Sequence, residues 1–283
     1  MTRYQDRGGN LSSSPSSGVT RREMLKGAGT AVTLGALAAA FGVTLPAGAR
    51  AAESAAGVNC MTILYPTGAG SKFDADYHRD HHLPLFMKHF GKSVERIELR
   101  KVVPAPAGAP AAAYAAAVNI WFDDLDVFNA NNAKYGQSLI DDIPNFTNVQ
   151  PEIQYDKVYG MVGAPRSAMI LGDTCVTILY PSEPNGRWDV EKYRTSHMPL
   201  IMKLYGPKAI KRFELRKGES GQTGGAPKYI GTVNIYIADQ NEFDAAAKQH
   251  TETLRKDVPS FSSVMPTALQ TTIHGLGMPP VAA

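Results

Sequence analysis

The sequence predicts an α+β protein in which two similar units, each with the element order β-α-β-β-α-β, pair within one chain to form a barrel. Two observations support this prediction. First, the segment CMTILYP at residues 60–66 returns 115 residues later as CVTILYP, at residues 175–181. Second, this shift is kept to the end of both units, apart from one inserted residue before RIELRK at 96–101 and RFELRK at 212–217. A register held over so long a stretch indicates a duplicated module.

Within each unit the local pattern changes from strand to helix and back. Runs rich in β-branched and aromatic residues indicate strands, and an aspartate that can cap a first turn, with a glycine or proline near the end, indicates a helix. In the first unit we expect strands at 62–65, 96–103, 116–122 and 152–159, a helix from Asp74 to near Gly91, and a helix from Asp124 to before Pro144. In the second unit we expect strands at 177–180, 212–217, 231–237 and 269–274, a helix from Asp189 to near Gly206, and a helix from Asp239 to before Pro259. The Pro-, Ala- and Gly-rich segments 104–113 and 218–227 are expected to be flexible connections.

This order is that of a ferredoxin-like unit, which places both helices on one face of a four-stranded antiparallel sheet. The other face would be a sheet-sized apolar surface, which a soluble protein does not leave in water. We therefore expect the units at residues 58–162 and 173–277 to face each other sheet to sheet, as an intramolecular pseudo-dimeric α/β barrel. The tether between them keeps the local concentration of each partner high.

The first 51 residues have the character of an export signal. Arg21 and Arg22 stand near the start of an apolar stretch at 28–45 in the manner of a twin-arginine motif, and Ala-Arg-Ala at 49–51 resembles a cleavage site. The apolar stretch is rich in Gly and Ala and barely reaches the roughly 20 residues that span a bilayer. We expect the twin-arginine machinery to export the chain and the leader to be removed. The product would be a periplasmic or extracellular protein with no stable membrane span, and a permanent anchor is the alternative.

Composition and charge exclude several functional classes. The 283 residues are 43% hydrophobic and 19% charged, which suits a folded chain. The leader carries six basic and two acidic side chains, so the remaining 23 basic and 24 acidic ones have a net charge of −1, which gives no support for nucleic-acid binding. Two cysteines, Cys60 and Cys175, exclude a disulfide-rich scaffold, and we expect them to remain separate thiols. The sequence has no glycine-rich phosphate loop and no nucleophile elbow, so nucleotide cofactors and serine hydrolysis lack support.

Two motifs carry a resemblance to a known family. Residues 73–85 read F-D-x-x-Y-H-x-x-x-H-x-P-L, and residues 142–148 read DIPNFTN. The second copy has W-D-x-x-x-Y-x-x-x-H-x-P-L at 188–200 and DVPSF at 257–261. These segments resemble the EthD family of the dimeric α/β-barrel superfamily. The resemblance implies the barrel, an oxidoreductase-type activity by family association, and the histidine of each H-x-P-L motif as a site residue. The wider superfamily includes haem proteins, cofactor-free monooxygenases, isomerases and dehydratases, so the fold does not fix the reaction.

The candidate site lies on the first helix of each unit. Asp74, His78 and His82 are spaced i, i+4 and i+8, so they form one stripe along that helix. Pro84 removes a helical hydrogen bond, so we expect a kink or break beside His82 that turns its imidazole toward the space between helix and sheet. Since the ordinary pKa of histidine is near 6.5, such a group can transfer a proton near neutral pH.

In the second unit His197 is the equivalent of His82, and Tyr193 stands in the place of His78. The catalytic candidates are His82, His197, Asp74, His78 and Tyr193. Three roles remain open for the histidines: a structural hydrogen bond at the helix break, general acid–base catalysis, and ligation of a metal or haem iron. His78, His82 and Asp74 have a spacing that suits metal ligands, but the second unit lacks this set, and no metal site is assigned.

Four further residues are candidates for substrate binding: Tyr65, Tyr180, Asn119 and Asn234. The two tyrosines end their strands before a loop, where the hydroxyl can face a cavity or the ring can fill the core. The two asparagines lie in apolar strands, where an amide needs a partner and either pins the backbone or orients a ligand. Arg100 and Arg216, each followed by a lysine, are expected at solvated strand ends.

The sequence thus predicts an exported oxidoreductase-type enzyme that acts on a small apolar organic molecule with a histidine as general acid or base. The alternatives are a non-catalytic module that binds haem or another small ligand, a cofactor-free dehydratase or isomerase, and a structural duplicate without a pocket. The cofactor is unknown; haem is compatible with the resemblance, whereas a nucleotide cofactor lacks its motif. The substrate and the active half stay open.

Overall fold

The computed structural model describes residues 57–105 and 110–279. The export signal predicted at residues 1–51 lies outside them. Among the described residues, no helix combines the length and the hydropathy needed to cross a membrane.

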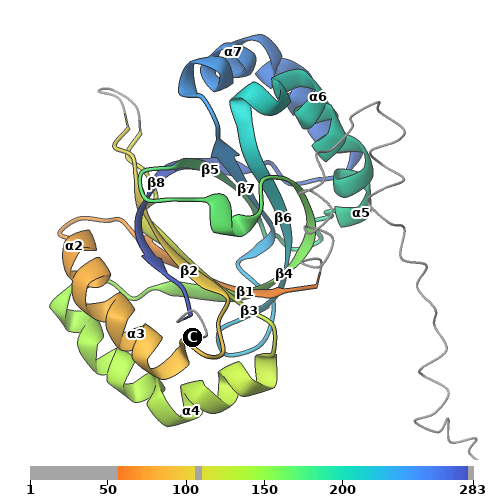
Figure 1. Ribbon diagram of the computed structural model, residues 1–283. Helices are drawn as coiled ribbons and strands as arrows, with labels where there is room; N and C mark the ends of the chain where they lie inside the picture. Colours follow the sequence, from red (N-terminus) through yellow and green to blue (C-terminus); the bar gives the residue numbers. More distant parts are fainter. Residues whose placement is uncertain (1–56, 106–109, 280–283) are drawn as a thin grey trace, which may run out of the picture. The chain divides into compact units, whose positions relative to one another are not determined.

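Eight antiparallel strands close into a barrel (Figure 1). In chain order they are β1 (Asn59–Pro66), β2 (Arg96–Val102), β3 (Tyr114–Phe122), β4 (Glu152–Gly163), β5 (Thr174–Pro181), β6 (Ile210–Gly221), β7 (Tyr229–Ile237) and β8 (Thr267–Gly277). Around the barrel the order is β1-β3-β2-β8-β5-β7-β6-β4. Because β4 also pairs with β1, every strand has two neighbours, and the barrel has no free edge.

Helices cover the barrel from outside in two groups (Figure 1). The first group is α2 (Ala75–Tyr77), a π-helical turn (His78–His82), α3 (Leu83–Phe90) and α4 (Leu125–Asp142). The second group is α5 (Val190–Lys192), a π-helical turn (Tyr193–His197), α6 (Met198–Ala209) and α7 (Gln240–Asp257). Three short 3-10 turns complete the described helices: Ile143–Asn145, Arg166–Ala168 and Val258–Ser260.

The four aspartates predicted to start helices all act as N-caps. Asp74, Asp124, Asp189 and Asp239 each accept a hydrogen bond from a backbone N–H of the first turn. Each satisfies an N–H that has no partner inside the helix, which fixes where the helix begins. The predicted helix starts are therefore confirmed.

The two halves are joined at their edges, which differs from the expected stacking of two separate sheets. β2 pairs with β8, and β4 pairs with β6, so hydrogen bonds run continuously from one half into the other. This pairing also lengthens β6, whose residues 218–221 were expected to belong to a flexible connection but pair with Gln154–Asp156 of β4. The partner strand lies in the other half, so local sequence gave no sign of it.

The interior of the barrel combines apolar clusters, such as that of Leu64, Ala117 and Leu179, with many buried polar and charged side chains, so the prediction of an apolar sheet face is only partly correct. Alternate residues of a strand point to opposite faces. In β2, Ile97 and Leu99 pack with the helices, whereas Arg96, Glu98 and Arg100 are buried on the other face.

Contacts between strands that are not neighbours show that these side chains cross the barrel. Glu214 on β6 accepts a hydrogen bond from the Trp121 indole on β3 at 2.8 Å, and Arg166 reaches the same carboxylate at 2.9 Å. Glu98 on β2 accepts a hydrogen bond from the Tyr236 hydroxyl on β7 at 2.7 Å. Buried charges need such partners, because an unpaired one would be strongly destabilising.

Arg100 and Arg216 are fully buried in this interior rather than at solvated strand ends. Each donates a hydrogen bond across the barrel to a thiol, Arg100 to Cys175 and Arg216 to Cys60, both at 2.8 Å. The two cysteines are free, as predicted. Burial raises the pKa of Cys60 to about 12.

Equivalent residues of the two halves meet each other inside the barrel. The Asn234 side-chain amide donates to Asn119 Oδ1 at 3.2 Å, and the hydroxyls of Tyr114 and Tyr229 are 2.5 Å apart. Both pairs are separated by 115 residues, the shift of the sequence repeat. Residues that are one repeat shift apart therefore contact each other in the interior.

Candidate functional site: two histidine–aspartate pairs

The helix that carries His82 widens into a π-helical turn rather than breaking. The Leu83 N–H bonds to the carbonyl of His78, five residues earlier, and α3 continues with Pro84 in its first turn. Proline has no N–H for an ordinary helical bond, so the turn before it has room to widen. The same arrangement recurs at Tyr193–His197 before Pro199.

His82 is paired with a carboxylate from the end of α4. Its Nδ1 lies 2.8 Å from Asp142 Oδ2, and the imidazole is 12% exposed. Asp142 Oδ1 accepts further hydrogen bonds from the Tyr77 hydroxyl at 3.0 Å and the Asn145 amide at 2.8 Å. Burial alone would raise the pKa of Asp142, but the hydrogen bonds from Asn145, His82 and Tyr77 hold it below its ordinary value.

Burial lowers the pKa of His82, and the hydrogen bond with Asp142 offsets that effect only in part. The imidazole is therefore neutral at pH 7. In the neutral ring, an Nδ1–H donated to Asp142 leaves the lone pair on Nε2. The pair can accordingly accept a proton at Nε2 and stabilise the imidazolium that results.

The second half has an equivalent histidine–aspartate pair, but its aspartate accepts fewer hydrogen bonds. His197 Nδ1 lies 2.7 Å from Asp257 Oδ2, and burial again lowers the pKa of the histidine. The positions equivalent to Tyr77 and Asn145 hold Lys192 and Ser260, neither of which bonds to Asp257 in the described structure. The side chain of Asp257 is 31% exposed, against 14% for Asp142.

His78 lies beneath His82, with its ring centroid 4.8 Å from that of His82 and 4.9 Å from that of Phe146. It is buried, and its Nδ1 has no hydrogen-bond partner among the described residues. Burial, with a smaller contribution from His82, lowers its pKa to about 3. Tyr193 takes the equivalent place between His197 and Phe261.

Asp74 does not join the histidines. Its carboxylate accepts the Tyr77 backbone N–H at 2.9 Å as the helix cap. The described residues contain no cluster of three or more His, Cys, Asp or Glu side chains arranged to hold a metal ion. The spacing of Asp74, His78 and His82 in sequence thus places two imidazoles together but not a set of three ligands.

The four residues proposed to bind substrate divide between two other places. Tyr65 and Tyr180 are buried in the apolar layers between helices and barrel, where burial raises the pKa of each hydroxyl. Asn119 and Asn234 lie inside the barrel and bond to each other. Neither asparagine therefore shares a layer with the histidines. Their amides bond to other side chains, Asn119 to Thr62 and Asn234 to Thr177, rather than to the backbone.

Asp142 and Asp257 are not among the site residues predicted from the sequence. Their mark in the sequence is an Asp-x-Pro segment that ends the second helix in both copies. What local sequence could not show is that residues 60 positions apart form a hydrogen bond.

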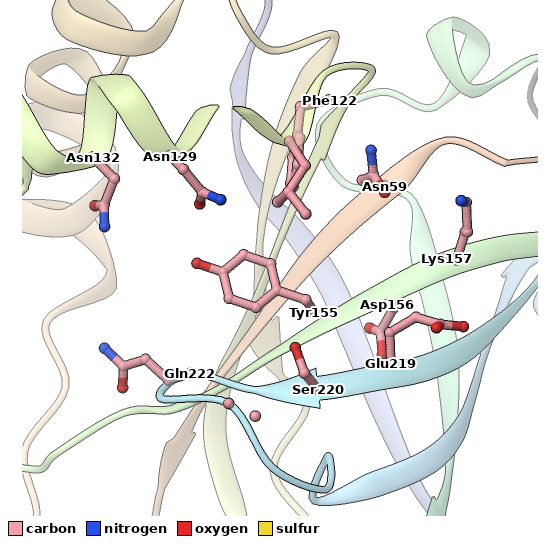
Figure 2. Close-up of a pocket in the computed structure, with 13 residues that line it drawn as sticks. Asn59, Phe122, Asn129, Asn132, Tyr155, Asp156, Lys157, Glu219, Ser220 and Gln222 are labelled. Carbon is pink, nitrogen blue, oxygen red and sulfur yellow. The ribbon is translucent and has the colours of Figure 1, made fainter. Parts of the chain in front are cut away.

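A separate cleft of about 460 Å³ lies between α4, residues 155–157 of β4 and the end of β6, so residues of both halves line it (Figure 2). We call it the amide cleft after the side chains that line it, among them Asn59, Asn129, Asn132 and Gln222, with Tyr155 and Phe122. None of the proposed site residues lines it. In the sequence, the mark of this cleft is three asparagines within four residues of one helix, at positions 129, 131 and 132.

No family model matches the sequence, and no curated protein matches it. Solved structures similar to the chain include an EthD-like protein from Ralstonia eutropha, 24% identical, covering 36% of this chain and 91% of that chain with a TM-score of 0.33. An anthrone oxidase-like protein is 7% identical over 79% of this chain and 93% of that one, with a TM-score of 0.46. A variant chlorite dismutase from Candidatus Nitrospira defluvii is 10% identical over 77% of this chain and 91% of that one, with a TM-score of 0.45. Similarity at this level assigns no activity.

Proposed function

We propose that the protein is an enzyme of oxidoreductase type in which His82 removes a proton from a small apolar organic substrate. One observation carries the proposal: the His82 imidazole is held by Asp142, itself fixed by Tyr77 and Asn145. A base that is oriented by a carboxylate and neutral at pH 7 is what general-base catalysis requires. The oxidoreductase class rests on the resemblance to the EthD family and not on the geometry.

The first half is the better candidate for the active one. Asp142 accepts three hydrogen bonds and is more buried than Asp257, so His82 is held in a single orientation more firmly than His197. Preorganised groups lower the free energy of reorganisation in the transition state. The rings of Phe146 and His78 lie 4.7 and 4.8 Å from that of His82, and Tyr77 stacks on Phe146; this ring-rich environment supports an apolar substrate.

The test is turnover by purified mature protein with a panel of phenols, quinols and anthrones, followed by oxygen uptake and product analysis. We expect His82→Gln to lower kcat by about 10²–10⁴, as loss of a general base does, and His197→Gln to change it little. Asp142→Asn should lower kcat and shift the pH profile, because the amide can donate to Nδ1 and favour the wrong tautomer. Full turnover by His82→Gln would refute the assignment, and product formation without an oxidant would indicate a dehydratase or isomerase.

We also propose that residues 58–162 and 173–277 are two copies of one ferredoxin-like unit. The support is that the same order of elements occurs twice and that residues 115 positions apart contact each other, as a twofold relation between two copies would require. The first 51 residues are proposed to direct export by the twin-arginine pathway, with the Arg21-Arg22 pair as support. Replacement of both arginines by lysine should retain the protein in the cytoplasm, and unchanged export would argue against that pathway.

A further inference from the structure

Two asparagines on one face of α4 have no structural partner in the described chain. Asn129 and Asn132 are one turn apart and point into the amide cleft (Figure 2). Their side chains form no hydrogen bond with a described residue, whereas Asn131 between them donates to Ser93. Both asparagines are exposed, so their amide groups are free to bind a ligand in the cleft. Asparagine is a poorer helix former than alanine, so packing and helix propensity do not account for two of them on this face.

The opposite wall of the cleft adds an aromatic ring and further polar groups. Tyr155 projects from β4 into the space below α4, and Gln222 lies beyond the end of β6 (Figure 2). The Tyr155 hydroxyl and the Gln222 side chain likewise form no hydrogen bond with a described residue. Partial burial raises the pKa of Tyr155, so its hydroxyl stays protonated and can donate.

Both acidic residues that line the cleft already have partners. The Asp156 carboxylate accepts hydrogen bonds from Thr62 and Gln154, and Glu219 pairs with Lys217 at 3.4 Å. The remaining charged lining residue, Lys157, is exposed, so the cleft contains no cluster of like charges that would select an ion. Amide and phenol groups both donate and accept hydrogen bonds, which matches hydroxyl groups that do the same. The flat face of Tyr155 can cover the C–H face of a ring. The volume of about 460 Å³ lies within the range of small-molecule sites, about 300–1,000 Å³.

The second half has lost or never had this arrangement. The positions equivalent to Asn129 and Asn132 hold Asp244 and Ala247 on α7. Where the first half has Leu125 and Tyr155, the second has Gln240 and Gln270, whose side-chain amides bond to each other at 3.4 Å. All four positions differ between the halves, and both halves fold. The side chains at these positions in the first half are therefore not ones that the fold requires.

We propose that the amide cleft is a binding site for a small, neutral polyhydroxylated ligand of the size of a mono- or disaccharide. The site is distinct from the His82–Asp142 pair and does not depend on the function proposed for it. Asn129, Asn132 and Gln222 bind ligand hydroxyls, and Tyr155 packs against the ring.

The experiment is saturation-transfer NMR and calorimetry of the mature protein with glucose, galactose, N-acetylglucosamine, maltose, cellobiose and trehalose. Saturable binding of at least one sugar is expected. The double variant Asn129→Ala/Asn132→Ala should weaken that binding at least tenfold. Because alanine favours a helix, this variant should fold at least as well as the parent, which circular dichroism and thermal unfolding can verify.

The matched control is Gln240→Ala/Asp244→Ala on α7, which should leave the affinity within twofold of the parent. Absence of saturable binding by every sugar of the panel would overturn the proposal. So would binding that the α4 variant retains, because the ligand would then occupy another place. Turnover by His82 is measured separately, so the failure of either proposal leaves the other standing.

Discussion

Exchanging the residues at positions 78 and 193 should move a pH-sensitive group from one half of the barrel to the other. His78 is buried against His82 and Phe146, and its pKa is lowered to about 3. In the unfolded chain the pKa of histidine is about 6.5. Below pH 6.5 the unfolded state therefore binds a proton that the folded state does not, and the free energy of unfolding decreases as the pH falls.

The two pKa values give the size of this effect. Between pH 8 and pH 5 the linkage amounts to about 2 kcal/mol of lost stability from this one side chain. Tyrosine does not ionise in that range, so His78→Tyr should remove about 2 kcal/mol from the difference in stability between the two pH values. Tyr193→His should add a comparable amount, since Tyr193 is buried in the same environment.

The assay is urea unfolding of the parent and both variants at pH 8 and pH 5. Each protein is compared with itself at the two pH values, so any loss of packing from the substitution cancels. Other groups titrate in this window, among them Asp156, whose pKa burial raises to about 6. Groups that do not contact position 78 or 193 contribute equally to all three proteins. A parent and a His78→Tyr variant with the same pH dependence would refute the reasoning.

Two further substitutions test the interior and the outer layer. Glu214→Gln removes the carboxylate that pairs with Arg166 and Arg212. It should lower the free energy of unfolding, measured with urea, by about 3–5 kcal/mol, because it leaves buried charges unpaired. A loss below about 1 kcal/mol would mean that the arginines find other partners. Gly231→Ala should destabilise by about 1–3 kcal/mol, because the new Cβ would lie 2.3 Å from the Trp188 ring. The first half has Ala116 and Phe73 at these positions, so adding Trp188→Phe should recover much of the loss, and a double variant no more stable than Gly231→Ala would contradict that explanation.

The candidate site was predictable in part. The H-x-P-L motif identified His82 and His197, and the proline two residues after each histidine correctly indicated an irregular helix. The partners Asp142 and Asp257 lie 60 residues away, and their role follows from the packing of one helix end against another. The amide cleft depends on the extension of β6 along β4, which no local pattern in residues 210–221 indicated.

The order of the described strands and helices was determined by sequence alone, because it depends on local chemistry. An aspartate caps the first turn of each major helical segment, and the alternation in RIELRK specifies a strand with two unlike faces. Tertiary structure alone decided what those faces meet. Alternation is the same whether a polar face contacts water or the inside of a barrel, so Arg100 and Glu98 could be assigned to the interior only once edge pairing between the halves had closed the sheet.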